Sequence, residues 1–326
     1  MLDIETLLES KGKKPYTGRE LTETERKNKE EPYRPSERLK YAVNLAILIG
    51  KRPLLLKGEP GSGKTRLAKA VANELGWEFR FWDIKSTTTA RDGLYRYDAV
   101  KRLQDAQLAG SSVPHIREAA IARLDTSERF AQSSKDESGE EKGNAYLQYG
   151  PLGEAFTSTD KPMVVLIDEI DKADIDFPND LLRELDQGIL RIEEIGKEHT
   201  AEHRPLIFVT SNDEKDLPDA FLRRCLFHYI EFPKPDELKE IVKLHQPQSD
   251  EDLIDLSVER FCQLRSKFKD KGKKISTAEL LDWYSVLVLD PDKDGVLREL
   301  DPNSKNPIPY PEILLKRWED WRLLDS

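Results

Sequence analysis

One segment, residues 58–65, constrains this chain more than any other. It reads Gly-Glu-Pro-Gly-Ser-Gly-Lys-Thr and fits the pattern G-x-x-x-x-G-K-[ST] in full. Such a loop cradles phosphate oxygens, because its glycines allow a tight turn and its backbone N–H groups, with those of the next helix, point inward. The apolar run Pro53–Leu56 predicts a buried strand before the loop, and Arg66–Leu75 predicts a helix after it.

This context favours an ATP site over a chance glycine turn. Lys64 supplies a mobile positive charge for the phosphates, and the hydroxyl of Thr65 is suited to Mg²⁺. The residues predicted to bind the nucleotide are Gly58, Glu59, Pro60, Gly61, Ser62, Gly63, Lys64, Thr65 and Arg66.

Two later strand-like segments end in polar residues suited to hydrolysis. Met163–Ile167 is followed by Asp168, expected to hold Mg²⁺, and by Glu169, expected to act as general base on the attacking water. Leu206–Thr210 leads to Asn212, whose amide could orient that water. By itself, the acidic pair could cap the next helix and Asn212 could be a turn residue. Their order behind a complete phosphate loop favours the catalytic interpretation.

Strand-like and helical segments alternate between residues 36 and 232. This alternation predicts an α/β domain, in which helices cover both faces of a parallel sheet in three layers. Together with the phosphate loop, it indicates a P-loop NTPase fold. Pro233 and Pro235 mark a boundary, and residues 233–326 contain helical patterns without a convincing strand. We therefore predict a small all-α lid domain after the core.

Two other segments carry weaker patterns. Residues 1–35 are polar and charged, so we expect a flexible N-terminal segment with a short helix at Ile4–Leu8. Residues 91–150 are expected to form a long irregular insertion, with a mobile surface loop at Ser133–Gly143. Its role is open.

Composition narrows the choice of partners and location. With 62 acidic and 52 basic residues, the formal net charge is −10. This sign repels phosphate backbones, so we expect a protein partner and no direct binding of nucleic acid. Only two cysteines occur, and there is no apolar run long enough to span a membrane, so we expect a cytoplasmic protein with no membrane contact.

Taken together, these motifs resemble those of AAA+ ATPases. The resemblance is carried by the phosphate loop, by Leu166–Asp171, by the strand ending at Asn212, and by the segment Ala220–Cys225. Within this class, Gly150-Pro151-Leu152 and Leu181–Asp186 resemble the MoxR branch. The resemblance covers approximately residues 36–326 and also places an inserted hairpin at Leu190–Pro205.

The resemblance implies a homo-oligomeric ring, such as a hexamer, with ATP between neighbouring subunits. Arg223 and Arg224 would be arginine fingers for the next subunit's γ-phosphate, with Arg224 preferred, because a guanidinium stabilises charge in the transition state. The alternative is an ordinary arginine pair at a helix end. Members of this branch act as chaperone-like remodellers, often beside a partner with a von Willebrand factor A domain.

One departure from the family pattern bears on the rate of hydrolysis. Many relatives carry an arginine at the start of a lid helix, where this chain has Ala278 or Glu279. Either Lys273 or Lys274 replaces that arginine, or the contact is missing. Two alternative functions therefore stay open: an ATP-dependent assembly switch with slow hydrolysis in bacterial signalling or defence, and a motor subunit of a nucleic-acid-processing complex.

Two further patterns imitate metal sites. His199 and His203 fit H-x-x-E-H, but they lie in a polar connection instead of a buried helix, which favours a solvated hairpin tip over zinc. The segment Asp290–Gly295 copies the first half of a calcium loop, but its twelfth position is Asp301, which favours an acidic turn.

Overall fold

The computed structural model describes residues 3–22, 25, 30–132, 144–212, 214–267, 275–301, 308–317 and 320–321. By their contacts, the residues form two compact units. The first comprises residues 1–16, 41–55 and 71–227, and the second comprises residues 17–40, 56–70 and 228–326.

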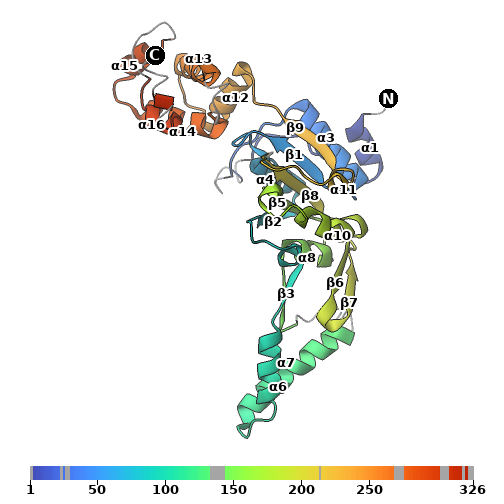
Figure 1. The fold of residues 1–326 in the computed structure, drawn as a ribbon. Coiled ribbons are helices and arrows are strands. Elements are labelled where there is room, and N and C mark those ends of the chain that lie inside the picture. Colours follow the sequence, from blue (N-terminus) through green and yellow to red (C-terminus); the bar gives the residue numbers. More distant parts are fainter. Residues whose placement is uncertain are drawn as a thin grey trace. The chain divides into compact units, whose positions relative to one another are not determined.

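A five-stranded sheet has the strand order β2-β5-β8-β1-β9 (Figure 1). Parallel pairing joins β2 to β5 and β5 to β8, with Trp82 opposite Ile167 and Ile167 opposite Val209. All six residues of β8 are buried, as a central strand with both faces covered requires. The predicted parallel α/β core is confirmed. The strands are β1 (Leu54–Gly58), β2 (Glu78–Asp83), β5 (Met163–Asp168), β8 (Leu206–Ser211) and β9 (Leu226–Ile230).

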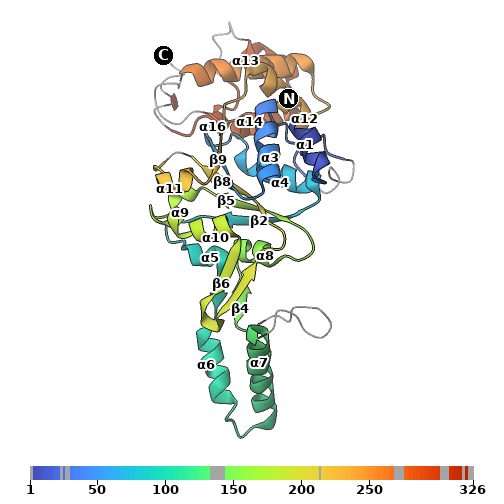
Figure 2. The same ribbon diagram turned by 90° about the vertical axis from the view of Figure 1, so that its right-hand side faces the viewer.

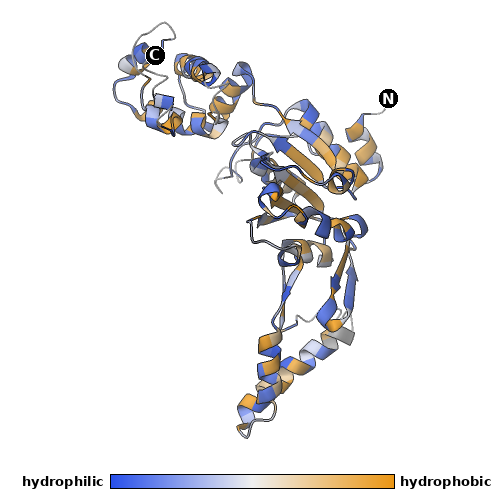
Figure 3. Cartoon of the chain, in the orientation of Figure 1, coloured by the Kyte–Doolittle hydropathy of each residue, from blue (hydrophilic) through white to orange (hydrophobic). Residues whose placement is uncertain are grey.

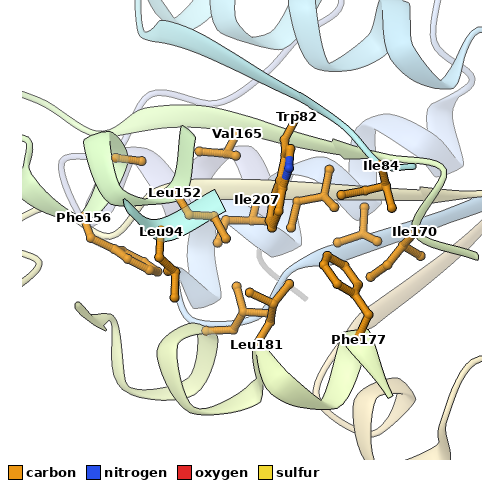
Figure 4. Packing of buried hydrophobic residues seen from close by; sticks show 14 of the residues in the cluster. Trp82, Ile84, Leu94, Leu152, Phe156, Val165, Ile170, Phe177, Leu181 and Ile207 are labelled. Atoms are coloured by element: carbon orange, nitrogen blue, oxygen red, sulfur yellow. The ribbon is translucent and has the colours of Figure 1, made fainter. Parts of the chain in front are cut away.

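The hydrophobic core of the first unit lies beneath β2, β5 and β8 (Figure 4). The ring of Trp82 meets that of Phe177 edge to face, with centroids 5.6 Å apart. Phe156 reaches the same cluster from a short helix, and Leu181 reaches it from the turn between two others. These helices are α8 (Pro151–Thr157), α9 (Phe177–Asp180) and α10 (Leu182–Gln187).

The insertion at residues 91–150 is largely regular, so the prediction of an irregular stretch is wrong. Two helices form a hairpin that extends away from the sheet strands of its unit (Figures 1 and 2). The Asp98 side chain caps the first helix by accepting a 2.8 Å hydrogen bond from the N–H of Lys101. The mobile loop predicted at Ser133–Gly143 lies outside the described residues. The elements are α5 (Ala90–Leu94), β3 (Tyr95–Tyr97), α6 (Ala99–Leu108), α7 (Pro114–Gln132) and β4 (Leu147–Tyr149).

A buried ionic cluster joins α6 to α7. The Asp105 carboxylate is 3% exposed and accepts hydrogen bonds from the Arg123 guanidinium at 2.8 and 2.5 Å, and from the Tyr146 hydroxyl at 2.8 Å. The hydrogen bond from Arg123 lowers the pKa of Asp105 to about 2. Since these groups satisfy one another, the hairpin has a polar interior in place of an apolar one.

A β-hairpin before β8 supports the base of these helices. Its strands, β6 (Ile189–Ile192) and β7 (Lys197–Thr200), pair antiparallel, so the structure contains the hairpin predicted at Leu190–Pro205. The Lys197 ammonium lies 3.4 Å from the centre of the Phe130 ring of α7, a cation–π contact.

The start of the chain is more closely packed than a loose tail. Helix α1 (Ile4–Ser10) contains the predicted short helix, and Leu8 and Tyr16 are buried. The backbone of Tyr16 exchanges two hydrogen bonds with the side chain of Asn44, at 2.7 and 2.9 Å. Asn44 belongs to α3 (Glu37–Ile49), and the Lys13 ammonium also donates to the carbonyls of Ile47 and Leu48 at the end of that helix.

The C-terminal part of the second unit is helical, as predicted. Trp283 is fully buried at the centre of its core and donates a 2.8 Å hydrogen bond to the carbonyl of Pro309. No described helix in either unit is both long and apolar enough to cross a membrane. The helices are α12 (Pro235–His245), α13 (Glu251–Lys267), α14 (Thr277–Leu289), α15 (Lys293–Leu300) and α16 (Pro311–Leu314).

Candidate functional site

The predicted phosphate loop runs from the end of β1 to the start of α4 (Lys64–Leu75). Gly61 and Gly63 have φ angles of 74° and 86°, in the left-handed region that favours glycine. A Cβ atom at position 61 would collide with Ser276, and one at position 63 would lie 2.9 Å from the Tyr33 ring. Both glycines are therefore required by conformation and by space.

Inside the loop, polar groups are arranged as a phosphate would need them. Lys64 is 7% exposed, and its ammonium donates to the carbonyls of Gly58 at 2.7 Å and Glu59 at 3.1 Å. The Ser62 hydroxyl oxygen is buried without a hydrogen-bond partner among the described residues. A buried hydroxyl of this kind fits an additional acceptor such as a phosphate oxygen. The residues present thus suit a triphosphate.

Arg66, also predicted to bind the nucleotide, is engaged within the second unit. Its Nε atom forms a 2.5 Å ion pair with Glu31, and its Nη1 atom lies 3.3 Å from Nε2 of His245. Burial lowers the pKa of His245, and so favours its neutral form as a partner for the guanidinium. These contacts connect the first turn of α4 to α12.

The residues predicted for hydrolysis lie together in the first unit, at the carboxyl ends of β5 and β8. Asn212 donates a 2.7 Å hydrogen bond from Nδ2 to Oε1 of Glu169. Lys172 forms an ion pair with the other oxygen of that carboxylate, and this contact raises the pKa of Lys172. The register of the parallel strands, with Ile167 opposite Val209, brings these side chains to one edge.

Glu169 has an unusual backbone conformation. Its φ and ψ are 58° and 51°, a left-handed conformation that costs a non-glycine residue about 1–3 kcal/mol. Its N–H donates a 2.8 Å hydrogen bond to the Thr210 hydroxyl, which in turn donates at 2.6 Å to the Asp168 carboxylate. Thr210 therefore fixes both acids, a role that the sequence did not reveal because its position reads as the buried end of a strand.

Asp171 is a second residue whose place the sequence analysis missed. It is 3% exposed, and its Oδ2 atom accepts backbone hydrogen bonds from Asn212 at 3.1 Å and Glu214 at 2.9 Å. The other carboxylate oxygen has no partner among the described residues. Asp171 thus holds the loop that presents Asn212. In the sequence, Asp171 stands two positions after Glu169, but this spacing was given no role.

The two candidate arginine fingers differ in their surroundings. Arg224 forms a 2.5 Å ion pair with Asp186 through Nε and donates at 2.9 Å to the carbonyl of Ala220. Arg223 is exposed, and its guanidinium has no ion-pair partner within the described part of the chain. They follow α11 (Asp219–Leu222) and precede Cys225, whose burial raises its pKa to about 12. Of the two predicted fingers, Arg224 is therefore engaged within the first unit, whereas the Arg223 side chain is exposed.

Neither metal-like pattern forms a metal site. His199 lies on strand β7, whereas the zinc-protease pattern needs both histidines on one helix. Asp292 caps α15 by accepting a 2.9 Å hydrogen bond from the N–H of Gly295, so the acidic segment is a helix start. Among the described residues, no group of three or more histidine, cysteine or acidic side chains could hold a metal ion.

Residues 53–225, more than half of the 326 residues, match the family model described as AAA domain (dynein-related subfamily). The matched segment begins just before β1 and ends at Cys225, so it includes the phosphate loop, the acids after β5 and both arginines. No curated protein matches the chain.

Proposed function

The chain belongs to the AAA domain family, dynein-related subfamily, whose members bind and hydrolyse ATP, and on this premise we propose that it is a MoxR-like remodelling ATPase. In this proposal, identical subunits form a ring, such as a hexamer, and hydrolysis changes the conformation or assembly of a protein partner. The α6–α7 hairpin is the observation that supports the protein partner in this proposal. None of the residues assigned to the nucleotide chemistry lies on either of its helices.

The nucleotide chemistry follows from the two groups of residues. The phosphate loop and Lys64 would bind the triphosphate, and Thr65 and Asp168 remain the residues that the sequence predicts as oxygen ligands for Mg²⁺. When bound, Mg²⁺ would offset phosphate charge. Glu169 would accept a proton from the attacking water, while Asn212 and Lys172 hold its carboxylate in one orientation. The strained backbone of Glu169 supports this role, since such strain often occurs at functional sites.

Exposed Arg223 supports ATP hydrolysis between subunits. We expect that neither the R223A variant nor the E169Q variant hydrolyses ATP efficiently alone, since one lacks the finger and the other the general base. In a mixture, a site with an intact Glu169 can receive Arg223 from an E169Q neighbour. Turnover measured by phosphate release should therefore rise on mixing. A mixture no more active than the two separate proteins would contradict ATP sites that are shared between subunits. Mixing R224A with E169Q in the same way shows which of the two arginines acts.

Helix α6 presents an apolar face for a partner. Val100 and Leu103 are 67% and 62% exposed, on the side of the helix opposite the buried Asp105. Lys101 and Arg102 are also exposed, but, four and three residues before Asp105, they lie on its side of the helix and flank the apolar face. Figure 3 shows apolar residues along both helices of the hairpin. In an otherwise acidic chain, this apolar face and the basic residues that flank it suit a protein partner with apolar and acidic residues, such as one carrying a von Willebrand factor A domain.

A substitution on α6 tests this surface. The double variant V100S/L103S should bind such a partner about tenfold more weakly than the wild type, because exposed apolar anchors dominate small interfaces. Its ATP turnover without partner should be unchanged. The control L289S alters another exposed apolar residue, 79% exposed at the end of α14 and outside the hairpin, and should bind normally. A photo-crosslinker at position 103 reports contact directly. Equal partner affinity in V100S/L103S and the wild type would place the partner on another surface.

A second candidate function is the ATP-dependent assembly switch with slow hydrolysis. The first turn of α14 contains Ala278 and Glu279, and Glu279 forms a capping box with Ser276, so this turn has no cation. The possible substitutes Lys273 and Lys274 lie outside the described residues. Ring assembly that is tight in ATP, combined with negligible multiple-turnover hydrolysis, would favour the switch over the remodeller.

A further inference from the structure

We propose that Arg265 is a positioning residue of the nucleotide site, which neutralises Glu59 of the phosphate loop and holds that loop at the start of α14. The proposal rests on ATP binding by this loop, as proposed above. Arg265 lies on α13 and would act on the nucleotide site through the side chain of Glu59.

Arg265 makes three contacts within the second unit. Its Nη2 atom forms an ion pair with the Glu59 carboxylate, and its Nη1 atom donates to the carbonyl of Ile275. The guanidinium carbon also lies 3.4 Å from the centre of the Phe232 ring. The side chain is only 12% exposed, in contrast to most arginines on helix surfaces. A planar fork that donates in two directions while its face covers a ring cannot be replaced fully by lysine.

The charge of Glu59 explains why this cation is needed. Glu59 lies between Gly58 and Pro60, inside the loop expected to surround the phosphates. A carboxylate at this position, if uncompensated, would repel a triphosphate and weaken its binding. The guanidinium of Arg265 offsets this charge at a partly buried position, where screening by water and salt is reduced.

The same guanidinium also connects the loop to α14. Ile275, which accepts its hydrogen bond, directly precedes Ser276, the N-cap of α14. Ser276 packs against Gly61 so closely that a Cβ atom at position 61 would collide with it. Since the first turn of α14 has no cation, Arg265 brings positive charge to this place from α13.

Affinity for ATP and ADP distinguishes this role from a purely structural one. The R265A variant should bind both nucleotides about tenfold more weakly, because the Glu59 carboxylate loses the charge of this guanidinium and repels the phosphates more strongly. The double variant E59Q/R265A should return to within about twofold of wild-type affinity, since the repelling charge is gone. Fluorescence titration gives the affinities, and thermal unfolding shows whether each variant folds. The control R298A removes an exposed arginine of α15 and should have no effect.

Two further variants keep the test decisive if R265A does not fold. E59Q should bind ATP at least as tightly as the wild type. R265K retains the charge but not the fork, so it should bind ATP more tightly than R265A. If R265A does not fold, the affinity of R265K should lie within about fivefold of the wild type. Unchanged affinity in R265A, no recovery in E59Q/R265A, or a clear loss in E59Q would overturn the proposal. K64A in the same titration reports on the site itself: undiminished binding there would contradict the proposed ATP site and not merely the part played by Arg265.

Discussion

ATP affinity is expected to fall at least about a hundredfold when Lys64 is replaced by alanine. The ammonium would make charge-assisted hydrogen bonds to phosphate oxygens, each worth about 1.5–3 kcal/mol, so the loss of two corresponds to this factor. Isothermal titration with ATP and Mg²⁺ measures the change. ATP hydrolysis should be lost in parallel at nucleotide concentrations that saturate the wild type.

An exposed lysine of the same helix provides the control. Lys69 lies in α4 and points to solvent, so K69A changes the net charge equally and should leave both binding and turnover intact. Because Lys64 also donates to the carbonyls of Gly58 and Glu59, a thermal melt should accompany the titration. If the folded K64A protein bound ATP as tightly as the wild type, the phosphate-loop interpretation would be wrong.

The second large effect is expected on the chemical step. In E169Q, kcat should fall by about 10²–10⁴-fold, the usual contribution of a positioned general base, whereas ATP affinity should change little. Glutamine keeps the volume of the side chain and can still accept the hydrogen bond from Asn212, but it cannot take a proton from water. Phosphate release under multiple-turnover conditions measures kcat.

Glu198 serves as the matched residue for this comparison, since it is an exposed glutamate on β7. The E198Q variant should hydrolyse ATP at the wild-type rate. If E169Q hydrolysed ATP as fast as E198Q, Glu169 would have no role in the reaction. A simultaneous loss of ATP affinity in E169Q would instead indicate that the carboxylate serves mainly to organise the site.

The regular core could be predicted because its signals are local. The apolar runs at β5 and β8 have no polar alternation, which is characteristic of strands covered on both faces. The structure confirms the parallel sheet built from them. It also places Glu169 beside Asn212, as their positions after two neighbouring strands suggested.

The α6–α7 hairpin could not be predicted in the same way. Both helices are exposed on several sides, so their apolar residues do not form the single stripe that identifies a surface helix. Its interior depends on Asp105 and Arg123, two charged residues that read as surface positions in the sequence. Only their mutual hydrogen bonds make burial of these groups favourable.

The sequence alone determined the α/β class and the triphosphate-binding loop, because a P-loop acts through its own backbone and neighbouring side chains, and because strand and helix periodicity are properties of short segments. Tertiary structure decided which charges are free and which are neutralised. It pairs Arg224 with Asp186, leaves Arg223 exposed, and joins Arg265 to Glu59 across 206 positions. A side chain's electrostatic role depends on which opposite charges lie within a few ångströms, and folding sets those distances.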